Sequence, residues 1–524
     1  MAGPFAGPAR GGRTALGRVP AARAVEVRPL ERWGNLIVVP EAVRFILDGR
    51  VRSVSEVDPT TTVLQWLRGP EQRCGTKEGC AEGDCGACTV VLGELRDGAV
   101  CLRAVNACLL LLPALDGKAL FTVESLRAPD GALHPVQRAL VECHGSQCGF
   151  CTPGFVMSMF ALYESEREPP PRRRIDEVLA GNLCRCTGYR PIVEAVRDAY
   201  RTGTRDGAEA RRSLASALGG IQRRGTLDLA HAGRRHVAPC SLDELAAFLV
   251  EHPEARLVAG ATDLGLLVTK EHRDLPLVVS VAGIPELRSI HHGPTHLEIG
   301  AAATYSDALG PLSAYHPDLG ELVRRIGSTQ IRNVATLGGN LANASPVGDM
   351  PPALLALDAS VVLRRGPEWR ELALSSFFLG YRRTALRPGE LVERIRIPHG
   401  PPGRRFAVYK LSKRFDQDIS GVCGAFAVEL EGGRVRSARV AYGGMAAVPV
   451  RAAAAEAALT GRPWTEATVE AGAAAVGVEL APISDMRAGA AYRRLAAGNL
   501  LRKFWIETAG APARTRVLAA EGSS

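Results

Sequence analysis

Cysteine clustering is the strongest constraint that this sequence places on the fold. Of the 13 cysteines in 524 residues, all but Cys240 and Cys423 lie between Cys74 and Cys186. Disulfides that staple a protein of this size would be spread along the chain, and disulfide-rich secreted scaffolds are usually much shorter. The clustering therefore indicates thiols that bind metal in a reducing compartment, and we expect a cytoplasmic location.

The length and composition predict a large globular protein. At about 100–200 residues per domain, the chain has room for three or four domains, and 46% of its residues are hydrophobic. No apolar run approaches the roughly 18 residues of a membrane-spanning helix, so we expect no membrane association. The net charge of +9 is partly concentrated in residues 1–32, and no long basic stripe follows, which argues against nucleic-acid binding.

Hydrophobic periodicity predicts a multidomain α+β protein. Apolar runs on either side of Asp48-Gly49 indicate a β-hairpin, and helical spacing is clear between about 134 and 200. Strands and Ala-rich helices alternate toward the C-terminus. We predict a disordered basic extension at 1–41, a β-rich domain at 42–126, a helical domain at 127–201, a polar linker at 202–236, an α/β or α+β domain at 237–410, and a final α+β domain at 411–524.

The first cysteine set has the spacing of a plant-type [2Fe–2S] site. Cys80, Cys85 and Cys88 form the pattern C-x4-C-x2-C, and Cys108 follows twenty residues later. Interspersed glycines relieve crowding, so that backbone N–H groups can point at the cluster sulfurs. We choose Cys108 as the fourth ligand over Cys101, which sits in an alternating strand pattern.

The second set combines the pairs Cys148/Cys151 and Cys184/Cys186, each predicted at the N-terminus of a helix. The helix dipole favours thiolates at that position. Four thiolates also suit zinc, so a structural zinc site remains an alternative for this set, whereas the loop of the first set is not an ordinary zinc spacing.

Two glycine turns stand out after the linker, at 257–265 and at 336–349. The first reads as strand, turn and helix, and exposes N–H groups where a phosphate can bind. Neither is a G-x-G-x-x-G, so a Rossmann site has no support. Taken alone, such turns between strand and helix are usually only turns.

The order of the two cysteine sets resembles the molybdenum hydroxylases of the xanthine dehydrogenase family. The matching stretches are 75–109, 145–158 and 181–192. The resemblance implies a plant-ferredoxin-like β-grasp domain and an α-helical [2Fe–2S] domain. It also implies two ligand sets, namely Cys80, Cys85, Cys88 and Cys108 for the outer cluster and Cys148, Cys151, Cys184 and Cys186 for the cluster nearest the molybdenum.

The same resemblance implies a vanillyl-alcohol-oxidase-type FAD domain and an α+β C-terminal flavoprotein domain. Ile326 stands where mammalian relatives place a Phe near the flavin ring, and residues 413–419 match a mobile family loop. The implied FAD contacts are Leu257, Val258, Ala259, Gly260, Ala261, Thr262, Asp263 and Leu264 for the pyrophosphate, and Thr336, Gly338, Gly339, Asn340, Ser345, Asp349, Val392 and Lys410 elsewhere.

The resemblance finally implies a function in electron transfer. The chain ends at Ser524 without the molybdenum domain of single-chain relatives, so we expect the small subunit of a xanthine dehydrogenase. A large molybdopterin-binding subunit would complete an (αβ)2 heterotetramer and hydroxylate hypoxanthine and xanthine to urate. Electrons would pass through both [2Fe–2S] clusters and FAD to NAD+.

Redox cofactors would carry this chemistry, so no side-chain nucleophile is expected as a catalytic residue. The alternatives are the small subunit of another molybdenum hydroxylase that oxidises aldehydes or N-heterocycles, an electron-transfer protein without flavin, and a zinc-binding structural protein.

Overall fold

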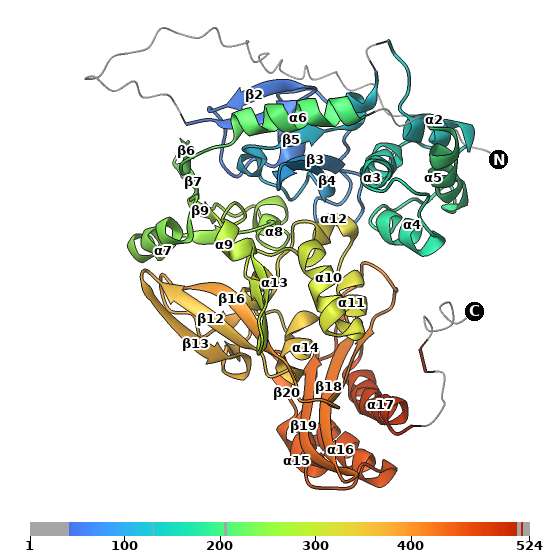
Figure 1. The fold of residues 1–524 in the computed structure, drawn as a ribbon, viewed down its shortest axis with the longest axis vertical. Coiled ribbons are helices and arrows are strands. Elements are labelled where there is room, and N and C mark those ends of the chain that lie inside the picture. Colours follow the sequence, from blue (N-terminus) through green and yellow to red (C-terminus); the bar gives the residue numbers. More distant parts are fainter. Residues whose placement is uncertain (1–40, 129, 204–206, 511–514, 517–524) are drawn as a thin grey trace, which may run out of the picture.

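The computed structural model describes residues 41–128, 130–203, 207–510 and 515–516. The extension predicted at 1–41 therefore lies, except for Glu41, outside the described residues. The two cysteine-rich domains form one end of an elongated molecule, a central domain follows, and the C-terminal domain forms the other end (Figure 1). Over the described ranges, no helix is both long and apolar enough to cross a bilayer.

The first domain is a β-grasp sheet with the strand order β2-β1-β5-β3-β4. The predicted hairpin is confirmed: β1 pairs antiparallel with β2, and the turn residues Asp48 and Gly49 both have positive φ, as a two-residue hairpin turn requires. The elements are β1 (Val43–Leu47), β2 (Arg50–Val54), α1 (Val63–Arg68), β3 (Thr89–Arg96), β4 (Ala99–Asn106), η1 (Leu112–Leu115), β5 (Ala119–Phe121) and η2 (Val123–Leu126).

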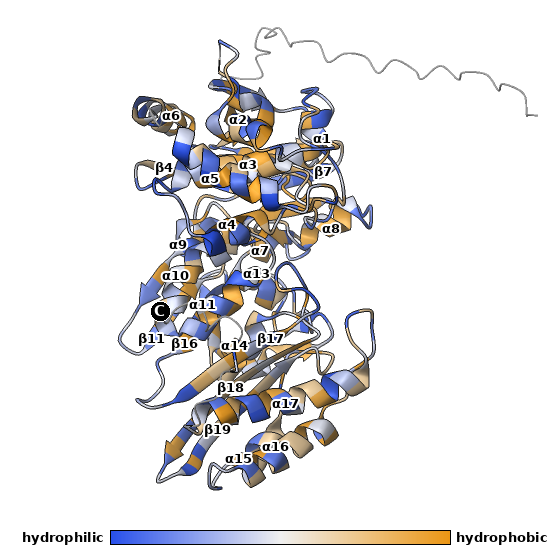
Figure 2. Ribbon diagram, turned by 90° about the vertical axis from the view of Figure 1, so that its right-hand side faces the viewer, coloured by the Kyte–Doolittle hydropathy of each residue, from blue (hydrophilic) through white to orange (hydrophobic). Residues whose placement is uncertain are grey.

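The second domain is helical, as predicted. Its central helix is buried on all sides from Gly154 to Tyr163, and Figure 2 shows the apolar character of this helix, α3. A helix that is apolar all round needs neighbours on every face, and the strands β3 and β4 of the first domain supply them together with the other three helices. The bounds are α2 (Pro135–Glu142), α3 (Thr152–Ser165), α4 (Arg172–Leu179) and α5 (Arg190–Thr202).

The segment 202–236, predicted as a polar linker, differs from that prediction. It contains α6 (Ala208–Ile221), β6 (Leu227–His231) and the start of β7 (Arg234–Ala238). Leu218 and Ile221 of α6 pack against Ile46 and Ala119 of the β-grasp sheet. Burial of a narrow apolar stripe stabilises this helix, although arginine, glycine and alanine dominate its composition.

The central domain begins with the sheet β6-β7-β9-β8, in which β7, β9 and β8 run parallel. Ser241 caps α7 by accepting the Glu244 N–H, but the Glu244 carboxylate accepts the N–H of Cys240, so the reciprocal bond expected of a capping box is not formed. The elements here are α7 (Leu242–Glu251), β8 (Arg256–Val258), α8 (Leu264–Thr269), β9 (Leu277–Ser280) and α9 (Pro285–Arg288).

A second sheet of the central domain has the order β10-β11-β16-β12-β13 and is antiparallel. Of the helices that follow β11, α12 lies nearest the cysteine-rich end, and α14 lies against the C-terminal strands β18 and β19 (Figure 1). The elements are β10 (Ile290–His292), β11 (His296–Gly300), α10 (Tyr305–Tyr315), α11 (Pro317–Arg324), α12 (Thr329–Arg332), α13 (Leu337–Ala342), α14 (Met350–Ala356), β12 (Ser360–Arg365), β13 (Glu368–Ala373), η3 (Leu374–Ser376), β14 (Phe378–Gly380), β15 (Arg383–Thr384) and β16 (Leu391–Pro398).

The C-terminal domain packs three helices on the sheet β17-β18-β19-β20. The boundary predicted between 410 and 411 differs from the structure, because it falls inside β17, which pairs along its length with β18. The elements are β17 (Arg405–Leu411), β18 (Val422–Glu431), β19 (Arg434–Gly443), β20 (Val450–Arg451), α15 (Ala453–Leu459), α16 (Glu466–Glu479) and α17 (Ala490–Thr508).

One buried group makes the stability of the central domain depend on pH. His236 of β7 is 1% exposed, and neither ring nitrogen has a hydrogen-bond partner among the described residues. Burial lowers its pKa from 6.5 to about 4. The unfolded chain binds a proton in this interval and the folded chain does not, so stability falls as the pH drops, by about 2 kcal/mol between pH 7 and pH 5.

We therefore expect His236→Leu to stabilise the central domain by about 1–3 kcal/mol, because it removes two unpaired buried nitrogens. The substitution should also make stability depend less on pH below pH 7. Thermal unfolding midpoints of the two proteins at pH 7 and pH 5 measure this difference. Parallel pH profiles would contradict it.

Candidate functional site

The first cysteine set lies on the loop between α1 and β3, with Cys108 at the end of β4. The four thiols meet in pairs: Cys80 hydrogen-bonds with Cys85, and Cys88 with Cys108. Glycine is required within the loop at Gly86, which has φ +69° and where a Cβ would lie 2.1 Å from a neighbouring backbone oxygen. The structure thus brings together all four residues that the spacing selected.

The backbone around Cys80 favours its thiolate form. The Cys85 thiol lowers the pKa of Cys80 to about 5, against the effect of burial, and the N–H groups of Cys85, Glu82 and Asp84 support this by donating to the Cys80 sulfur at 3.3, 3.4 and 3.3 Å. Thiolate is the form that binds metal. The loop therefore fits a cationic iron cluster whose sulfur ligands accept N–H groups.

The second set lies where two helices of the second domain begin. Cys151 is the N-cap of α3, and Cys184 and Cys186 precede α5. The side chain of Cys148 hydrogen-bonds with Cys186, and that of Cys151 with Cys184. Burial, together with the Cys184 thiol, raises the pKa of Cys151 to about 12. The four predicted residues are again together, in two pairs.

Pairwise contact bears on which metal the thiols could hold. A single zinc ion takes four donors around one point. A [2Fe–2S] cluster instead takes two thiolates on each of two irons. Both sets fit the two-iron arrangement. Cys101, paired across the strands with Glu94, lies in β4 as expected.

The two sets are joined by one short backbone contact. The N–H of Leu183, the residue before Cys184, donates to the carbonyl of Cys85 at 3.0 Å. The ring of Phe150, between Cys148 and Cys151, also lies against the first loop, where it would be 3.6 Å from a Cβ at Gly79. Sequence spacing contained no signal for either contact.

The first glycine turn follows β8 and leads into α8, as predicted. Ala261 adopts φ +57°, and the N–H groups of residues 260–263 donate to no backbone carbonyl among the described residues. Successive free N–H groups at a turn of this kind form an anion-binding concavity. The geometry fits a pyrophosphate, and residues 257–264 could hold it.

The second glycine turn lies beside the first. The Val334 carbonyl would be 2.0 Å from a Cβ at Gly260, and Thr336 caps α13 by accepting the Gly339 N–H at 3.0 Å. The Asn340 Oδ1 atom is buried and has no hydrogen-bond partner in the described ranges. An unpaired buried acceptor is costly unless a ligand satisfies it, so Asn340 fits a cofactor donor such as a ribose hydroxyl.

A buried ion pair closes this site. Lys410 donates to Asp349 at 2.6 Å, and both residues are less than a tenth exposed. Ser420 donates to the other Asp349 oxygen. The Tyr305 hydroxyl has no hydrogen-bond partner among the described residues, and burial, together with the nearby Asp349 charge, raises its pKa. Ser420 and Tyr305 were missed by sequence reasoning, because nothing in their strand and helix patterns marks them.

The predicted contact Val392 lies in a strand, β16, that packs against the helix of the second glycine turn, α13. Val392 is buried in β16, opposite Leu363, within the central core. Ile326 is partly buried at the edge of the same core. The predicted loop 413–419 is held by Arg325, whose guanidinium lies 4.6 Å from the centre of the Phe415 ring and donates to the Lys410 carbonyl at 2.9 Å.

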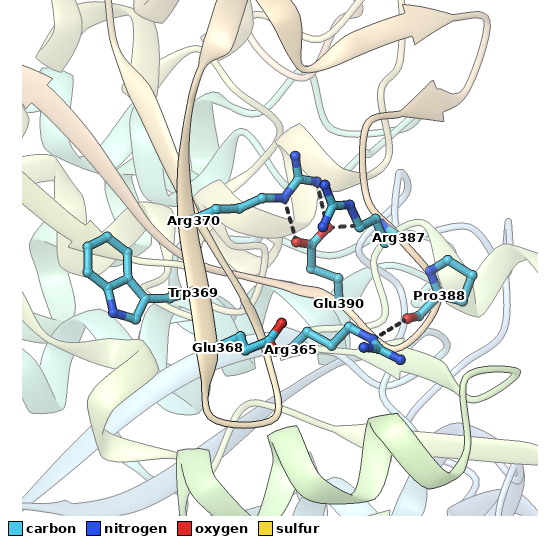
Figure 3. Close-up of a pocket in the computed structure, with 7 residues that line it drawn as sticks. All are labelled: Arg365, Glu368, Trp369, Arg370, Arg387, Pro388 and Glu390. Carbon is cyan, nitrogen blue, oxygen red and sulfur yellow. Dashed lines mark hydrogen bonds and ion pairs between the residues drawn. The ribbon is translucent and has the colours of Figure 1, made fainter.

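A surface cavity of about 420 Å³ lies elsewhere, between the β12–β13 hairpin and residues 387–390. Arg370 and Glu390 form a two-bonded ion pair across it, at 2.7 and 2.8 Å, and Trp369 points to the opposite side of the strand (Figure 3). None of its lining residues belongs to the thiol sets or the glycine turns, so we assign it no part in the site.

Four family models match the chain one after another and cover most of its length. They describe a 2Fe-2S iron-sulfur cluster binding domain at residues 45–111, a [2Fe-2S] binding domain at 122–197, an FAD binding domain in molybdopterin dehydrogenase at 232–400, and a CO dehydrogenase flavoprotein C-terminal domain at 407–508. The fold class expected from the sequence is thereby confirmed.

Curated relatives include xanthine dehydrogenase/oxidase of Rattus norvegicus, 32% identical over 88% of this chain and 38% of the relative. Xanthine dehydrogenase of Drosophila pseudoobscura pseudoobscura is 33% identical over 88% of this chain and 39% of its own length. The chain thus spans about two fifths of the relatives it matches. A carbon monoxide dehydrogenase structure from Hydrogenophaga pseudoflava is 30% identical over 51% of this chain and 94% of that one, with a TM-score of 0.49.

Substitution at Gly260 tests whether the two turns form one cofactor site. We expect Gly260→Ala to displace the first turn, because its Cβ would meet the Val334 carbonyl at 2.0 Å, and to lower FAD affinity about tenfold or more, which 1.4 kcal/mol of strain suffices to do. The control is Gly283→Ala, whose Cβ meets nothing within 4 Å. Fluorescence of released flavin per chain measures the effect, and equal flavin retention in both variants would contradict it.

Proposed function

Because the chain carries the four domains of the iron–sulfur and FAD portion of a molybdenum hydroxylase, we propose that it is the electron-transfer small subunit of a xanthine dehydrogenase. In this proposal it passes electrons from a molybdopterin subunit to NAD+ while hypoxanthine and xanthine are hydroxylated to urate. The two thiol sets hold the [2Fe–2S] clusters, and the two glycine turns hold FAD.

The observation that carries the proposal is an unbroken series of contacts between these sites. Leu183 and Cys85 join the second thiol set to the first. On its other side the first loop touches α8, where Thr269 donates to the Ala81 carbonyl at 2.8 Å and Lys270 to the Cys80 carbonyl at 3.1 Å. The helix α8 begins at the end of the 257–264 turn. The two thiol sets are therefore in direct contact, and α8 connects the first set to the 257–264 turn.

The exposed end of this series suits a partner subunit. Cys148 and Cys186 are solvent-exposed, and around them Phe150, Leu183 and Tyr189 expose apolar surface. Exposed thiols and neighbouring apolar side chains are typical of a surface that becomes buried on association. A molybdopterin subunit that covers this face would bring its cofactor next to the second thiol set.

The bound cofactors would supply the redox chemistry, with single electrons carried by the clusters and two electrons exchanged at the flavin. The residues of this chain position and insulate them. The backbone N–H groups at Cys80 hold thiolate charge, the turn at 260–263 offers donors to phosphate, and the Asp349–Lys410 pair keeps the flavin site polar and ordered.

Serine substitutions test the assignment of the two thiol sets. Cys85→Ser and Cys184→Ser should each abolish one of two distinguishable EPR signals of the reduced protein, because each removes a ligand from a different cluster. The matched control is Cys74→Ser, an exposed thiol outside both sets, which should keep both signals. If neither ligand substitution removed a signal, the assignment would be wrong.

Association tests the proposed partner. We expect the chain to co-purify with a larger molybdenum-containing subunit and to support xanthine-dependent NAD+ reduction only in that complex. Reduction that depends on aldehydes or on N-heterocycles other than purines would instead place the complex among the other molybdenum hydroxylases. A monomer of this chain with full purine-dependent activity would rule out the proposed division between subunits.

A further inference from the structure

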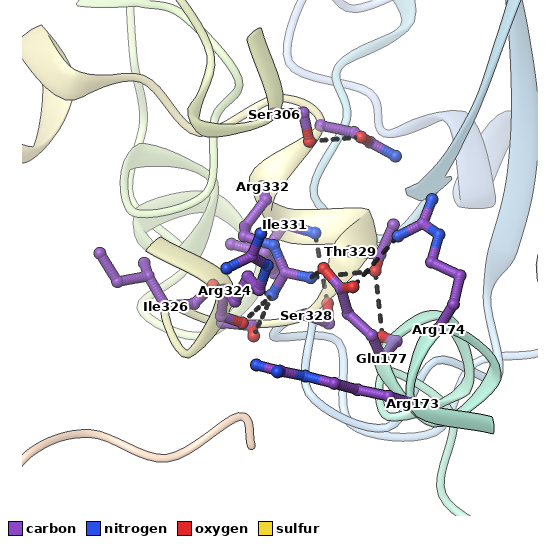
Figure 4. Close-up of polar contacts among 12 residues, drawn as sticks. Arg173, Arg174, Glu177, Ser306, Arg324, Ile326, Ser328, Thr329, Ile331 and Arg332 are labelled. Atoms are coloured by element: carbon purple, nitrogen blue, oxygen red, sulfur yellow. Dashed lines mark hydrogen bonds and ion pairs between the residues drawn. The ribbon is translucent and has the colours of Figure 1, made fainter. Parts of the chain in front are cut away.

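A four-residue helix of the central domain, α12, is inserted between the two cysteine-rich domains. Thr329 and Arg332 both reach Glu177 of α4: the Thr329 hydroxyl donates to the Glu177 carbonyl at 3.1 Å, and the Arg332 guanidinium to its carboxylate at 3.2 Å (Figure 4). On the other side, Asn333 donates to the Ala104 carbonyl of β4 at 2.8 Å. This helix is therefore the junction of all three domains.

Gln330 is the fully buried member of α12. Its Nε2 atom donates to three acceptors in two other domains: Thr89 Oγ1 at 3.3 Å, Ser158 Oγ at 3.1 Å and Asn182 Oδ1 at 3.1 Å. All four side chains are at most 1% exposed. Buried networks of this kind specify one arrangement of the segments that they join, because a misplaced member leaves polar groups unpaired.

The acceptors stand next to the thiol loops. Asn182 Nδ2 donates to the Gly86 carbonyl at 3.0 Å, which fixes the loop between Cys85 and Cys88. Asn182 also directly precedes Leu183, whose N–H reaches the Cys85 carbonyl. The position of the Asn182 amide thus controls the contact between the two sets.

Gly181 makes room for the glutamine. A Cβ at Gly181 would lie 1.9 Å from Gln330 Oε1 and 2.6 Å from its Cδ. The same Oε1 atom has no hydrogen-bond partner in the part of the chain that the structure describes. The amide is therefore held by its donor side and by the fit against Gly181.

We propose that Gln330 is a positioning residue for electron transfer: through Asn182 it holds the Leu183 N–H on the Cys85 carbonyl, and so fixes the separation of the two clusters. This inference rests on the proposed function. Loss of Gln330 leaves Ser158 bonded to Asn182, and Asn182 to Gly86, so the fold survives. Asn182 loses the donor that restrains it from the central domain, and the contact between the sets opens more often.

The test uses the full chain as purified, with Gln330→Met as an isosteric variant that lacks the donor. Hydrogen–deuterium exchange of the Leu183 amide should become about tenfold faster, the change expected for about 1.4 kcal/mol of lost hydrogen bonding. The spin–spin splitting between the two reduced clusters should weaken, while both EPR signals and the iron content stay. Gln137→Met, which removes a capping glutamine of α2 remote from both loops, is the matched control and should leave both readouts unchanged.

Gly181→Ala tests the same contact by displacing the Gln330 amide with a Cβ on the neighbouring segment. With Gln330 in place, this substitution should also make the Leu183 amide exchange faster. In a Gln330→Ala background it should not change the Leu183 exchange rate further, because the new Cβ has no amide to displace. If Gln330 had only a structural role, Gln330→Met would lower the unfolding temperature but leave the Leu183 exchange rate and the cluster splitting unchanged. That result would overturn the proposal. If the thiol sets hold no iron–sulfur clusters, the wild-type chain shows no iron signals at all, while the exchange experiment still decides the role of Gln330.

Discussion

Contact between thiols from separate segments of the chain is the constraint on which the rest of the structure depends. The first set takes three thiols from one loop and the fourth, Cys108, from the end of the β-grasp strand β4. The second set takes one pair from the start of α3 and the other pair from the segment between α4 and α5. Close approach of backbone at Gly86 is part of the same requirement.

The position of the central domain follows from the same requirement. Helix α8 contacts the first loop, and α12 contacts the junction between both loops. The first glycine turn precedes α8 and the second follows α12, so both turns are held close to the thiols. Apolar packing of Leu109 and Leu111 against α8 and α12 accompanies hydrogen bonds to backbone carbonyls and buried amides, and only the hydrogen bonds are directional. Directional contacts fix separations, and separation is what matters for electron transfer between sites.

Much of this arrangement could be predicted from the sequence, because local chemistry determines it. The spacing of Cys80, Cys85 and Cys88 reflects one loop, and a proline marks each of the two helix starts that follow the thiols of the second set. The choice of Cys108 over Cys101 followed from strand alternation. The turns at 257–264 and 336–340 could be found as turns, but only the resemblance suggested a cofactor there.

The rest depended on tertiary contacts that leave no pattern in sequence. The apolar stripe of α6, with Leu214, Leu218 and Ile221 at helical spacing, is diluted by arginine, glycine and alanine, so 202–236 looked like a linker. Helix α12 is too short for periodicity to reveal it, and Gln330 is an ordinary polar residue until three domains close around it. The domain boundary predicted between 410 and 411 divides β17, because the pairing of this strand with β18, and not its own sequence, sets the boundary.

The most direct test of the central claim is metal, sulfide and flavin analysis of the purified chain. The account predicts iron and acid-labile sulfide in the amounts of two [2Fe–2S] clusters, one for each matched iron–sulfur domain, together with one extractable FAD. Zinc without iron would contradict it, because the thiol pairs would then hold single ions. Iron without FAD would keep the clusters but remove the flavin end of the proposed route.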